Sequence, residues 1–525
     1  MELTQEQAAV VDAAAHGVRR IVVEAGAGAG KTSTIVAAAK AKRRQRGLLT
    51  VFNRMMAEET RPRLVGTGCT ASTLHSVAWR SAVAEPFKRS GGARLNVMLP
   101  ARDAAEAVGI RGPVTISQEL GETSRNAVGD LLKDWVTRFC HSSSDVISSQ
   151  HFPAATLREF LTPDLAKKAD EDPKWMSMLT RAYAGALAPH AARLWGLMSQ
   201  PDGDFPTTHD TYLKLYVMSR PSVGCDYVML DEAQDANPIM LQFMQLAEQQ
   251  GAQTIYVGDS YQQMYSWRGA VDALRQIDAD ARLRLTQSFR FGPAVADVAN
   301  LVLGGLRHSD FRIVGAGRPS RVVETIDAPN AVICRKNATA IAMALEAREA
   351  GCRVGLCMNP KELLREVDAL ERFQANGRTD ARRFRRFASF EEMQESVENG
   401  DAPDLKILLD LIAEHNYDGT RSILSEIAVG KTPEEIERSK VQTVFLTGHA
   451  SKGLQFQHVL LGDDFKGVAK LESAPAAVRA EEFNILYVAV TRAQSTLCLG
   501  NSEAAGDLRA LMQQAAAAAP ALSAA

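Results

Sequence analysis

Residues 25–34 read AGAGAGKTST and directly follow the apolar run Ile21, Val22 and Val23, which predicts a buried strand that leads into a glycine-rich loop. Small residues let backbone N–H groups approach phosphate oxygens, while the lysine supplies a charge and the threonine a hydroxyl for Mg²⁺. The helix expected from about residue 32 adds its positive N-terminal end. A nucleoside triphosphate site is therefore predicted at Ala25, Gly26, Ala27, Gly28, Ala29, Gly30, Lys31, Thr32 and Ser33.

The composition is that of a globular protein with several domains. With 525 residues the chain exceeds the size at which one hydrophobic core keeps growing, so two to four domains are expected. Hydrophobic residues make up 46% of the chain and charged residues 23%, which suits a globular protein in water. The net charge of −2 excludes a global basic field, so any nucleic-acid site must be a local groove.

Cysteine usage and hydropathy exclude several further classes. The seven cysteines are scattered, with no C-x-x-C or Cys/His pattern, so we expect reduced thiols and no cysteine-based metal site. The N-terminal MELTQEQAAV lacks an apolar signal core, and no stretch approaches about 18 continuous apolar residues. Neither secretion nor membrane spanning is expected.

Apolar runs typical of buried strands occur in two sets along the chain. The first set lies at residues 21–24, 48–52, 227–230 and 254–257, and the second at 331–334, 441–446, 459–461 and 496–499. Each run is followed by a helical segment, which predicts two α/β cores with parallel sheets. The long intervening stretches have helical periodicity and are too long for loops, so we interpret them as helical insertions.

These patterns predict five regions. Residues 1–84 and 208–275 form the first core, and residues 85–207 form an insertion within it. Residues 276–339 and 441–510 form the second core, which is interrupted by an insertion at 340–440. The alanine-rich end at 511–525 is expected to be a disordered tail.

A pair of acids follows the predicted strand at 227–230. In an enzyme with a phosphate-binding loop, the first carboxylate (Asp231) can hold Mg²⁺ and the second (Glu232) can orient or deprotonate the attacking water. A solvated loop start is the alternative. Residues 256–270 then combine Gln262, a candidate sensor of the γ-phosphate, with aromatic residues beside an arginine. Aromatic faces that stack on bases contribute about 1–3 kcal/mol per base, although packing is the alternative role here.

Several segments together resemble one family. QQMYSWRGAVDAL, LTQSFRFG, ICRKNAT and NILYVAVTRA resemble segments of superfamily 1 DNA helicases of the UvrD/PcrA class, and most closely the F-box DNA helicase group. The resemblance covers nearly the whole chain, and Ala25 fits the A-x-x-x-x-G-K-T form common in this class. It implies two RecA-like P-loop NTPase domains. Because no F-box segment precedes Leu3, assembly into a ubiquitin ligase is not expected.

The resemblance also implies roles around ATP. Gln7 matches the glutamine that reads the adenine edge, and Phe289 matches an aromatic that stacks on adenine. Thr32 and Asp231 would hold Mg²⁺, and the catalytic set would be Lys31, Asp231, Glu232, Gln262, Arg290 and Arg492. Gln455, near the nucleotide, replaces the usual glutamate, and Phe483 stands where an arginine is common. These departures bear on the rate of hydrolysis rather than on the type of reaction.

Implied DNA contacts fall in four segments. They comprise Phe52, Asn53, Thr73, His75, Tyr265, Trp267, Arg268 and His449. A basic run at residues 378–387, RTDARRFRRF, is either a solvated helix face or a contact with duplex DNA, and the latter would make binding steeply salt-dependent. His209 is expected to be a packing residue.

The expected function is an ATP- and Mg²⁺-dependent DNA helicase or translocase in repair or recombination. The resemblance implies 3′→5′ movement on single-stranded DNA and binding to junctions with duplex DNA. The alternative is an ATP-switched DNA-binding regulator that clears a recombinase or other protein without net unwinding. A cytoplasmic protein is expected, located at the nucleoid in a bacterium or in the nucleus of a eukaryote. The sequence leaves the oligomeric state and specific repair partners open.

Overall fold

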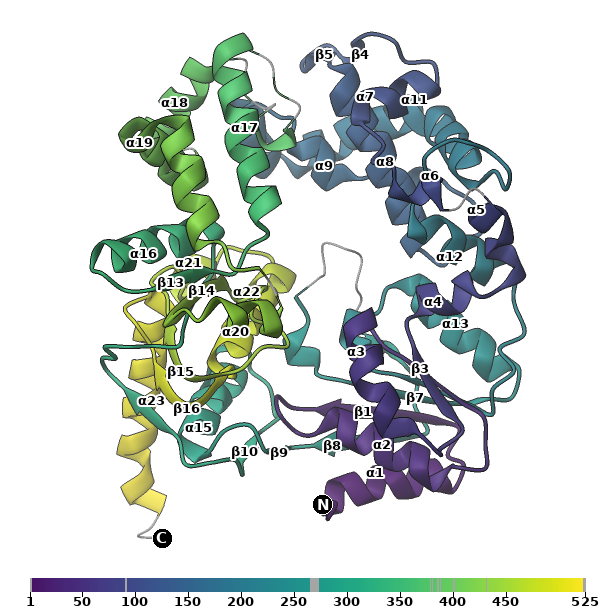
Figure 1. Cartoon of the computed structure of the whole chain (residues 1–525), viewed down its shortest axis with the longest axis vertical. Helices are drawn as coiled ribbons and strands as arrows, with labels where there is room; N and C mark the ends of the chain where they lie inside the picture. The colour runs from purple at the N-terminus through teal and green to yellow at the C-terminus, as the bar shows by residue number, and fades with distance from the viewer. Residues whose placement is uncertain are drawn as a thin grey trace.

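Two six-stranded sheets, one in each half of the chain, organise the fold (Figure 1). The structure is a computed structural model that describes residues 2–522 except 90, 91, 265–272, 378, 380, 385, 386, 388, 400, 401 and 431. All strand pairs in both sheets are parallel among these residues. The predicted pair of parallel α/β cores is confirmed.

The first sheet has the order β3-β2-β6-β7-β1-β8. Its strands are β1 (Arg20–Ala25), β2 (Gly47–Thr50), β3 (Cys69–Ser72), β6 (Tyr227–Leu230), β7 (Gln253–Gly258) and β8 (Ala281–Leu285). Ile21 and Val23 point into a core with helices α1 (Gln5–Ala15) and α2 (Lys31–Ala41), while Val22 points into another with α13 (Pro238–Gln249). Because both faces are covered by helices, the central strands are continuous apolar runs.

The second sheet has the order β11-β16-β15-β12-β14-β13. These strands are β11 (Arg321–Val323), β12 (Ala331–Cys334), β13 (Val354–Leu356), β14 (Thr443–Thr447), β15 (Phe456–Leu461) and β16 (Ala493–Cys498). Helix α22 (Ala476–Val490) is buried from Phe483 to its end and belongs to the same core as Ala27, Tyr261 and Met264 of the first half. Side chains of this helix therefore reach the glycine-rich loop.

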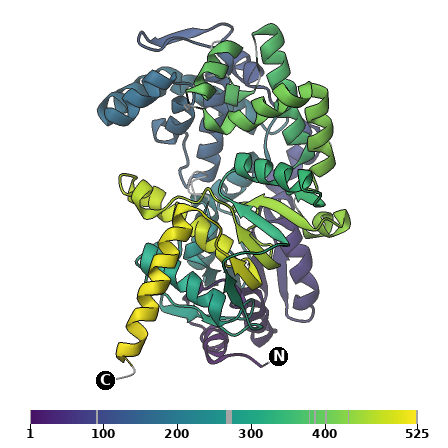
Figure 2. The ribbon, with the colours of Figure 1, turned by 90° about the vertical axis from the view of Figure 1, so that its left-hand side faces the viewer.

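Two mainly helical insertions lie at the end of the molecule opposite the N-terminus (Figure 2). The first contains α7 (Ala101–Ala107), α8 (Arg125–His141), α11 (Pro173–Ser199) and the antiparallel hairpin of β4 (Val114–Ser117) and β5 (Gly121–Thr123), followed by α12 (His209–Met218). The second contains α17 (Pro360–Asn376), α18 (Phe390–Glu398) and α19 (Pro403–Ile427). Among the described residues, no helix is long and apolar enough to cross a membrane.

The structure differs from the predicted boundaries in three places. Strand β8 pairs with β1, so the first core extends past residue 275 to Leu285. Strand β13 pairs with β14, so the second insertion begins after Leu356 rather than at residue 340. Helix α23 (Glu503–Leu522) continues through most of the predicted disordered tail, because alanine has the highest helix propensity.

Candidate functional site

The glycine-rich loop joins β1 to α2 and has the backbone shape of an anion site. Gly28 and Gly30 have φ angles of 74° and 76°, a region that glycine adopts without a steric cost. A Cβ atom on Gly28 would also lie 2.6 Å from atoms of Ser288 and Arg290. Lys31 begins α2, so the positive end of the helix and the ammonium group face the same space.

A cavity of about 650 Å³ opens at this loop and lies between the two cores. The first core contributes residues 28–33, Glu232 and Gln262, and the second contributes residues 452–455 and Arg492. Phe289 and Arg290 line it from the segment that follows β8. Cations from both halves of the chain therefore face one space, which can hold a polyanion.

Gln7 and Phe289, the two residues predicted to contact adenine, both lie next to Gly30 of the loop. Gln7 is buried and held by a reciprocal capping box with Thr4, and its Nε2 lies 3.4 Å from the Ala29 carbonyl oxygen. The Phe289 backbone N–H donates to the Gly28 carbonyl oxygen at 2.9 Å, while the ring is 45% exposed. An amide beside an accessible ring can hydrogen-bond and stack on a planar heteroaromatic group.

Of the two acids that follow β6, Glu232 lines the same cavity and Asp231 precedes it in the chain. Asp231 is only 4% exposed, and its Oδ1 accepts the Glu232 backbone N–H at 2.9 Å. Burial and the adjacent Glu232 charge raise the pKa of Asp231. Burial opposes ionisation of Glu232, but the charges of Lys31 and Lys452 outweigh it and lower the pKa of this carboxyl. A divalent cation between Asp231 and Thr32 would offset the crowded negative charge, so these residues fit Mg²⁺.

Gln234 fixes the acidic segment to the end of β7. Its Nε2 donates to the Glu232 carboxylate, and its Oε1 accepts the Asp259 backbone N–H at 3.0 Å. Gly258 allows this approach, because a Cβ there would lie 2.3 Å from the Gln234 amide oxygen. The orientation of Glu232 is therefore set by a buried side chain that was not among the predicted site residues.

Lys452 crosses from the second core to the first. Its ammonium group donates to the Asp235 carboxylate and, at 2.9 Å, to the Gln262 carbonyl oxygen. Burial raises the pKa of Asp235 to about 6, against the opposing charge of Lys452. Neither residue is among the predicted site residues, although Lys452 lies in the segment TGHASKGLQF, which matches a family segment that links DNA backbone contacts to the nucleotide. This ion pair joins the two cores next to the cavity at the glycine-rich loop, which we call the nucleotide cavity.

The two predicted arginines lie together at the wall of the cavity. Arg492 is 1% exposed, and it donates from Nε to the Val488 carbonyl oxygen at 2.9 Å and from Nη2 to Gln262 Oε1 at 3.4 Å. Arg290 is partly buried and donates to the Thr491 carbonyl oxygen at 3.1 Å. Burial lowers the pKa of both guanidinium groups. Bound negative charge would favour their charged forms.

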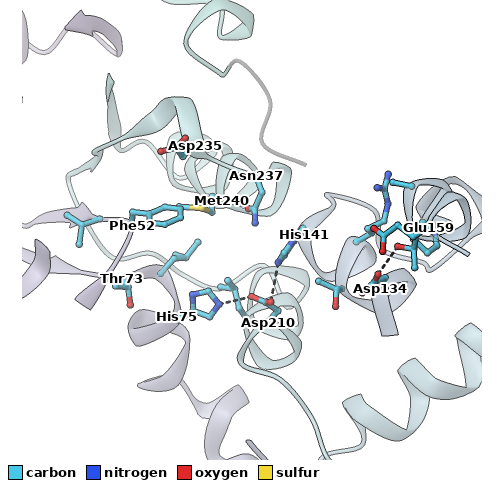
Figure 3. Close-up of a pocket in the computed structure, with 18 residues that line it drawn as sticks. Phe52, Thr73, His75, Asp134, His141, Glu159, Asp210, Asp235, Asn237 and Met240 are labelled. Atoms are coloured by element: carbon cyan, nitrogen blue, oxygen red, sulfur yellow. Dashed lines mark hydrogen bonds and ion pairs between the residues drawn. The ribbon is translucent and has the colours of Figure 1, made fainter. Parts of the chain in front are cut away.

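A second cavity of about 790 Å³ lies between the first core and the first insertion (Figure 3). The predicted DNA-contact residues Phe52, Thr73 and His75 line it. Asn53 does not; its side chain caps α3 (Arg54–Thr60) through the Met56 backbone N–H at 2.9 Å, and it faces the nucleotide cavity. Phe52 and Asp235 line both cavities, which are therefore adjacent.

Asp210 joins the core and the insertion within the second cavity. It accepts from His75 Nε2 at 2.8 Å and from His141 Nε2 at 3.1 Å (Figure 3). Burial opposes its ionisation, but the two hydrogen bonds outweigh burial and hold the pKa of Asp210 well below its usual range. His209 bonds the Tyr212 hydroxyl at 3.0 Å, which agrees with a packing role.

The remaining predicted DNA contacts are Tyr265, Trp267, Arg268 and His449. Tyr265, Trp267 and Arg268 lie outside the described residues. His449 is partly buried and hydrogen-bonds the Met264 backbone, and burial together with the Arg335 charge lowers the pKa of its imidazole. His449 thus contacts the last described residue before the predicted stacking residues.

The residues that depart from the family pattern have different surroundings. Gln455 is exposed and lines the nucleotide cavity, whereas Phe483 is buried in the core of the second half. Of the basic run at 378–387, Arg378, Arg385 and Arg386 lie outside the described residues. Its two phenylalanines are buried in the second insertion, so they are core residues rather than a surface for bases.

A different basic surface lies between the two insertions. A cleft of about 980 Å³ is lined by Arg102, Arg111 and Arg125 of the first insertion and by Arg372 of the second. No acidic side chain lines it among the described residues. We call it the arginine cleft. The sequence contains no local signal for it, because its arginines are far apart along the chain.

The described residues contain no group of three or more His, Cys, Asp or Glu side chains that could hold a metal ion by themselves. No disulfide joins the cysteines of the described residues. The cation site at Thr32 and Asp231 would therefore depend on a bound nucleotide for further ligands.

Comparisons with known proteins agree with the motifs. The model of the AAA domain family matches residues 5–268, and that of the UvrD-like helicase C-terminal domain matches residues 361–504. The chain is 27% identical over 495 residues to F-box DNA helicase 1 of Gallus gallus, which covers 87% of this chain and 45% of that protein. F-box DNA helicase protein 1 of Schizosaccharomyces pombe is 26% identical over 423 residues, 73% of this chain and 44% of that protein.

A shorter match is to the probable DNA helicase II homolog of Mycoplasma pneumoniae, 33% identical over 85 residues, or 15% of this chain and 12% of that protein. The chain spans less than half the length of these two F-box DNA helicases.

Proposed function

Because the chain belongs to the UvrD-like helicases, in the part of that family close to the F-box DNA helicases, we propose that it is an ATP-dependent DNA helicase that moves along single-stranded DNA. The observation that carries this proposal is the pair of adjacent cavities, one formed by both cores and one next to the predicted DNA segments, which share Phe52 and Asp235. ATP-driven strand displacement from a tailed duplex tests it.

ATP would bind with its adenine between Gln7 and Phe289 and its phosphates on the glycine-rich loop. Lys31 neutralises the β- and γ-phosphates. Thr32 and Asp231 would hold Mg²⁺, which would supply positive charge to offset the negative charge on ADP as it leaves. Glu232 orients and deprotonates the attacking water. Arg290 and Arg492 then stabilise the charge that develops on the transferred phosphoryl group.

Hydrolysis would be coupled to movement through the contacts between the cores. Lys452 of the second core holds Asp235 and the Gln262 backbone of the first. Asp235 also lines the second cavity, which we call the DNA cavity, so a γ-phosphate that attracts Lys452 would change the wall of that cavity. Alternating closure and opening would move the strand in small steps. Separation of one base-pair step costs about 1.4 kcal/mol, which is little for a nucleotide-driven motor.

The 3′→5′ direction and a role in repair or recombination rest on the class that the motifs resemble. They stay proposals for this chain. Reversal of the tail polarity in a displacement assay tests the direction. Displacement only from a duplex with a 5′ tail would contradict it.

Phe52 should contribute to the binding of single-stranded DNA. Its ring is 40% exposed and lines the DNA cavity, where a base can stack on it. Phe52→Ala is expected to raise the dissociation constant for an oligonucleotide by about tenfold, as the removal of one stacking platform does. Fluorescence anisotropy measures this change, and Val65→Ala, which removes another exposed apolar side chain of the same core, is the control.

Phe52 also borders the nucleotide cavity, so ATP-analogue affinity must be measured on the same variant. A change in nucleotide affinity alone, with DNA affinity equal to that of the control, would contradict a base-stacking role for Phe52.

The arginine cleft is proposed to contact the phosphates of duplex DNA ahead of the single strand. Its four arginines come from both insertions, and phosphate contacts release counterions. The triple variant Arg102→Ala, Arg111→Ala and Arg372→Ala is expected to lower the salt slope of binding to a tailed duplex by about 0.9 for each phosphate that is no longer neutralised. Anisotropy titrations at several salt concentrations measure this slope.

A matched control removes the same charge from exposed arginines outside the cleft: Arg181, Arg193 and Arg365. The control variant should keep the wild-type slope. Equal slopes for the cleft variant and the wild type would exclude the cleft as a duplex site.

A further inference from the structure

A continuous chain of buried hydrogen bonds joins the glycine-rich loop to Arg492. It begins at the Ala27 backbone N–H, which donates to the Tyr487 hydroxyl oxygen at 3.1 Å. The Tyr487 hydroxyl donates to Asp259 Oδ2 at 3.2 Å, and the same oxygen accepts from Gln262 Nε2 at 2.6 Å. Gln262 Oε1 then accepts from Arg492 Nη2 at 3.4 Å. Every step except that between Gln262 and Asp259 links residues that are far apart in the sequence.

The chain of hydrogen bonds passes three times between the two halves of the protein. Tyr487 and Arg492 belong to the second half, whereas Ala27, Asp259 and Gln262 belong to the first. The side chains of Tyr487, Asp259, Gln262 and Arg492 are all buried. In such surroundings a hydrogen bond is strong, and a missing partner is costly.

Asp259 determines which way the Gln262 amide faces. Its Oδ1 accepts the Tyr261 backbone N–H at 3.1 Å, and its Oδ2 takes the two side-chain donors, so the carboxylate offers only acceptors. The Gln262 NH₂ group must therefore face Asp259, which turns its oxygen toward Arg492. If the Gln262 amide were flipped, its oxygen would face the Asp259 carboxylate, another acceptor, and its NH₂ group would face the Arg492 guanidinium, another donor.

Tyr487 keeps this arrangement attached to the loop. Burial raises the pKa of Asp259, so the carboxylate needs donors to stay charged, and the Tyr487 hydroxyl is one of them. The hydroxyl oxygen also takes the Ala27 N–H, which a phosphate would otherwise attract. Ala27 thus supports the loop from behind instead of binding the nucleotide.

We propose that Tyr487 and Asp259 are positioning residues for ATP hydrolysis, which hold the Gln262 amide in the orientation that can sense the γ-phosphate and transmit the position of the loop to Arg492. This inference rests on the proposed ATPase function and adds two residues to it. Neither touches the reacting atoms; both act through Gln262 and Arg492.

The test is the DNA-stimulated ATPase of the full chain with Tyr487→Phe, which removes one oxygen atom. It is expected to lower kcat by about tenfold or more and to change KM for ATP by less than about twofold, because the loop and Lys31 remain. Tyr183→Phe is the matched control. It removes another buried tyrosine hydroxyl, which bonds Thr123 in the first insertion, and should leave kcat unchanged.

Asp259→Asn provides a second variant of nearly equal volume. Its amide can donate where the carboxylate accepts, so Gln262 should flip and kcat should fall at least as far as in Tyr487→Phe. Because both changes act on one chain, the double variant should be no slower than Asp259→Asn by more than about twofold. Thermal melting of each variant checks that the fold is kept.

Several results would overturn the inference. The first is a Tyr487→Phe kcat within about twofold of the wild-type kcat, provided that the wild type hydrolyses ATP. The second is a loss of kcat in the double variant that equals the product of the losses in the two single variants. If Tyr487→Phe does not fold, normal kcat in Asp259→Asn overturns the inference equally well. A wild type without any DNA-stimulated hydrolysis would instead contradict the proposed function itself.

Discussion

Glu232→Gln is expected to lower the kcat of DNA-stimulated ATP hydrolysis by about 10²–10⁴-fold, the usual contribution of a positioned general base. The change keeps the shape of the side chain and removes its charge. Glu232 lines the nucleotide cavity and is oriented by Gln234, so its carboxylate is held where a water could lie between it and a γ-phosphate. Steady-state phosphate release measures the effect.

Nucleotide binding should survive this change, because the glycine-rich loop and Lys31 are intact. An ATP analogue should therefore bind Glu232→Gln with wild-type affinity within about threefold, and bind Lys31→Ala much more weakly. Glu58→Gln, the same chemical change on the exposed face of α3, is the control. Normal hydrolysis in Glu232→Gln would show that the acidic pair is not catalytic.

Arg290→Ala is expected to lower kcat by about 10³–10⁵-fold, the range found for arginines that stabilise a transferred phosphoryl group. Arg290 suits this test better than Arg492, since the structure gives it one side-chain hydrogen bond, to the Thr491 carbonyl oxygen. Arg492 also donates to Val488 and Leu454, so its loss would disturb packing. Single-turnover hydrolysis with excess enzyme separates the chemical step from product release.

The control for Arg290 is Arg284→Ala on β8, which removes the same charge from the strand that leads into this segment. Arg284 is exposed and pairs with Asp310, so its loss should change kcat by less than about twofold. Equal rates for Arg290→Ala and the wild type would contradict the assignment of a γ-phosphate arginine.

Local patterns were enough to predict the two cores. The apolar runs at 21–24, 227–230 and 254–257 lie in β1, β6 and β7, whose positions between helical layers require such runs. Strand β8 lacks this signal because it lies at the edge of the sheet, where Arg282 and Arg284 alternate with leucines. Strand β13 has three residues, too few for a recognisable pattern.

The glycine-rich loop and the acids after β6 were recognisable for the same reason: each is a short motif at the end of a buried strand. The contacts between the two halves were not recognisable from the sequence. Lys452 and Asp235 are 217 positions apart, and Tyr487 and Ala27 are 460 apart, so no spacing in the sequence predicts that they meet. Asn53, which was assigned to DNA by resemblance, also caps a helix, and its contact with DNA stays a prediction.

The central claim is that ATP hydrolysis between the two cores separates DNA strands. Displacement of a labelled strand from a duplex with a 3′ single-stranded tail, with ATP and Mg²⁺, tests it most directly. The account predicts displacement by the wild type and none by Glu232→Gln, although both proteins bind the substrate. DNA-stimulated hydrolysis by the wild type without displacement from either tail polarity would contradict it, and would favour a regulator that clears proteins from DNA.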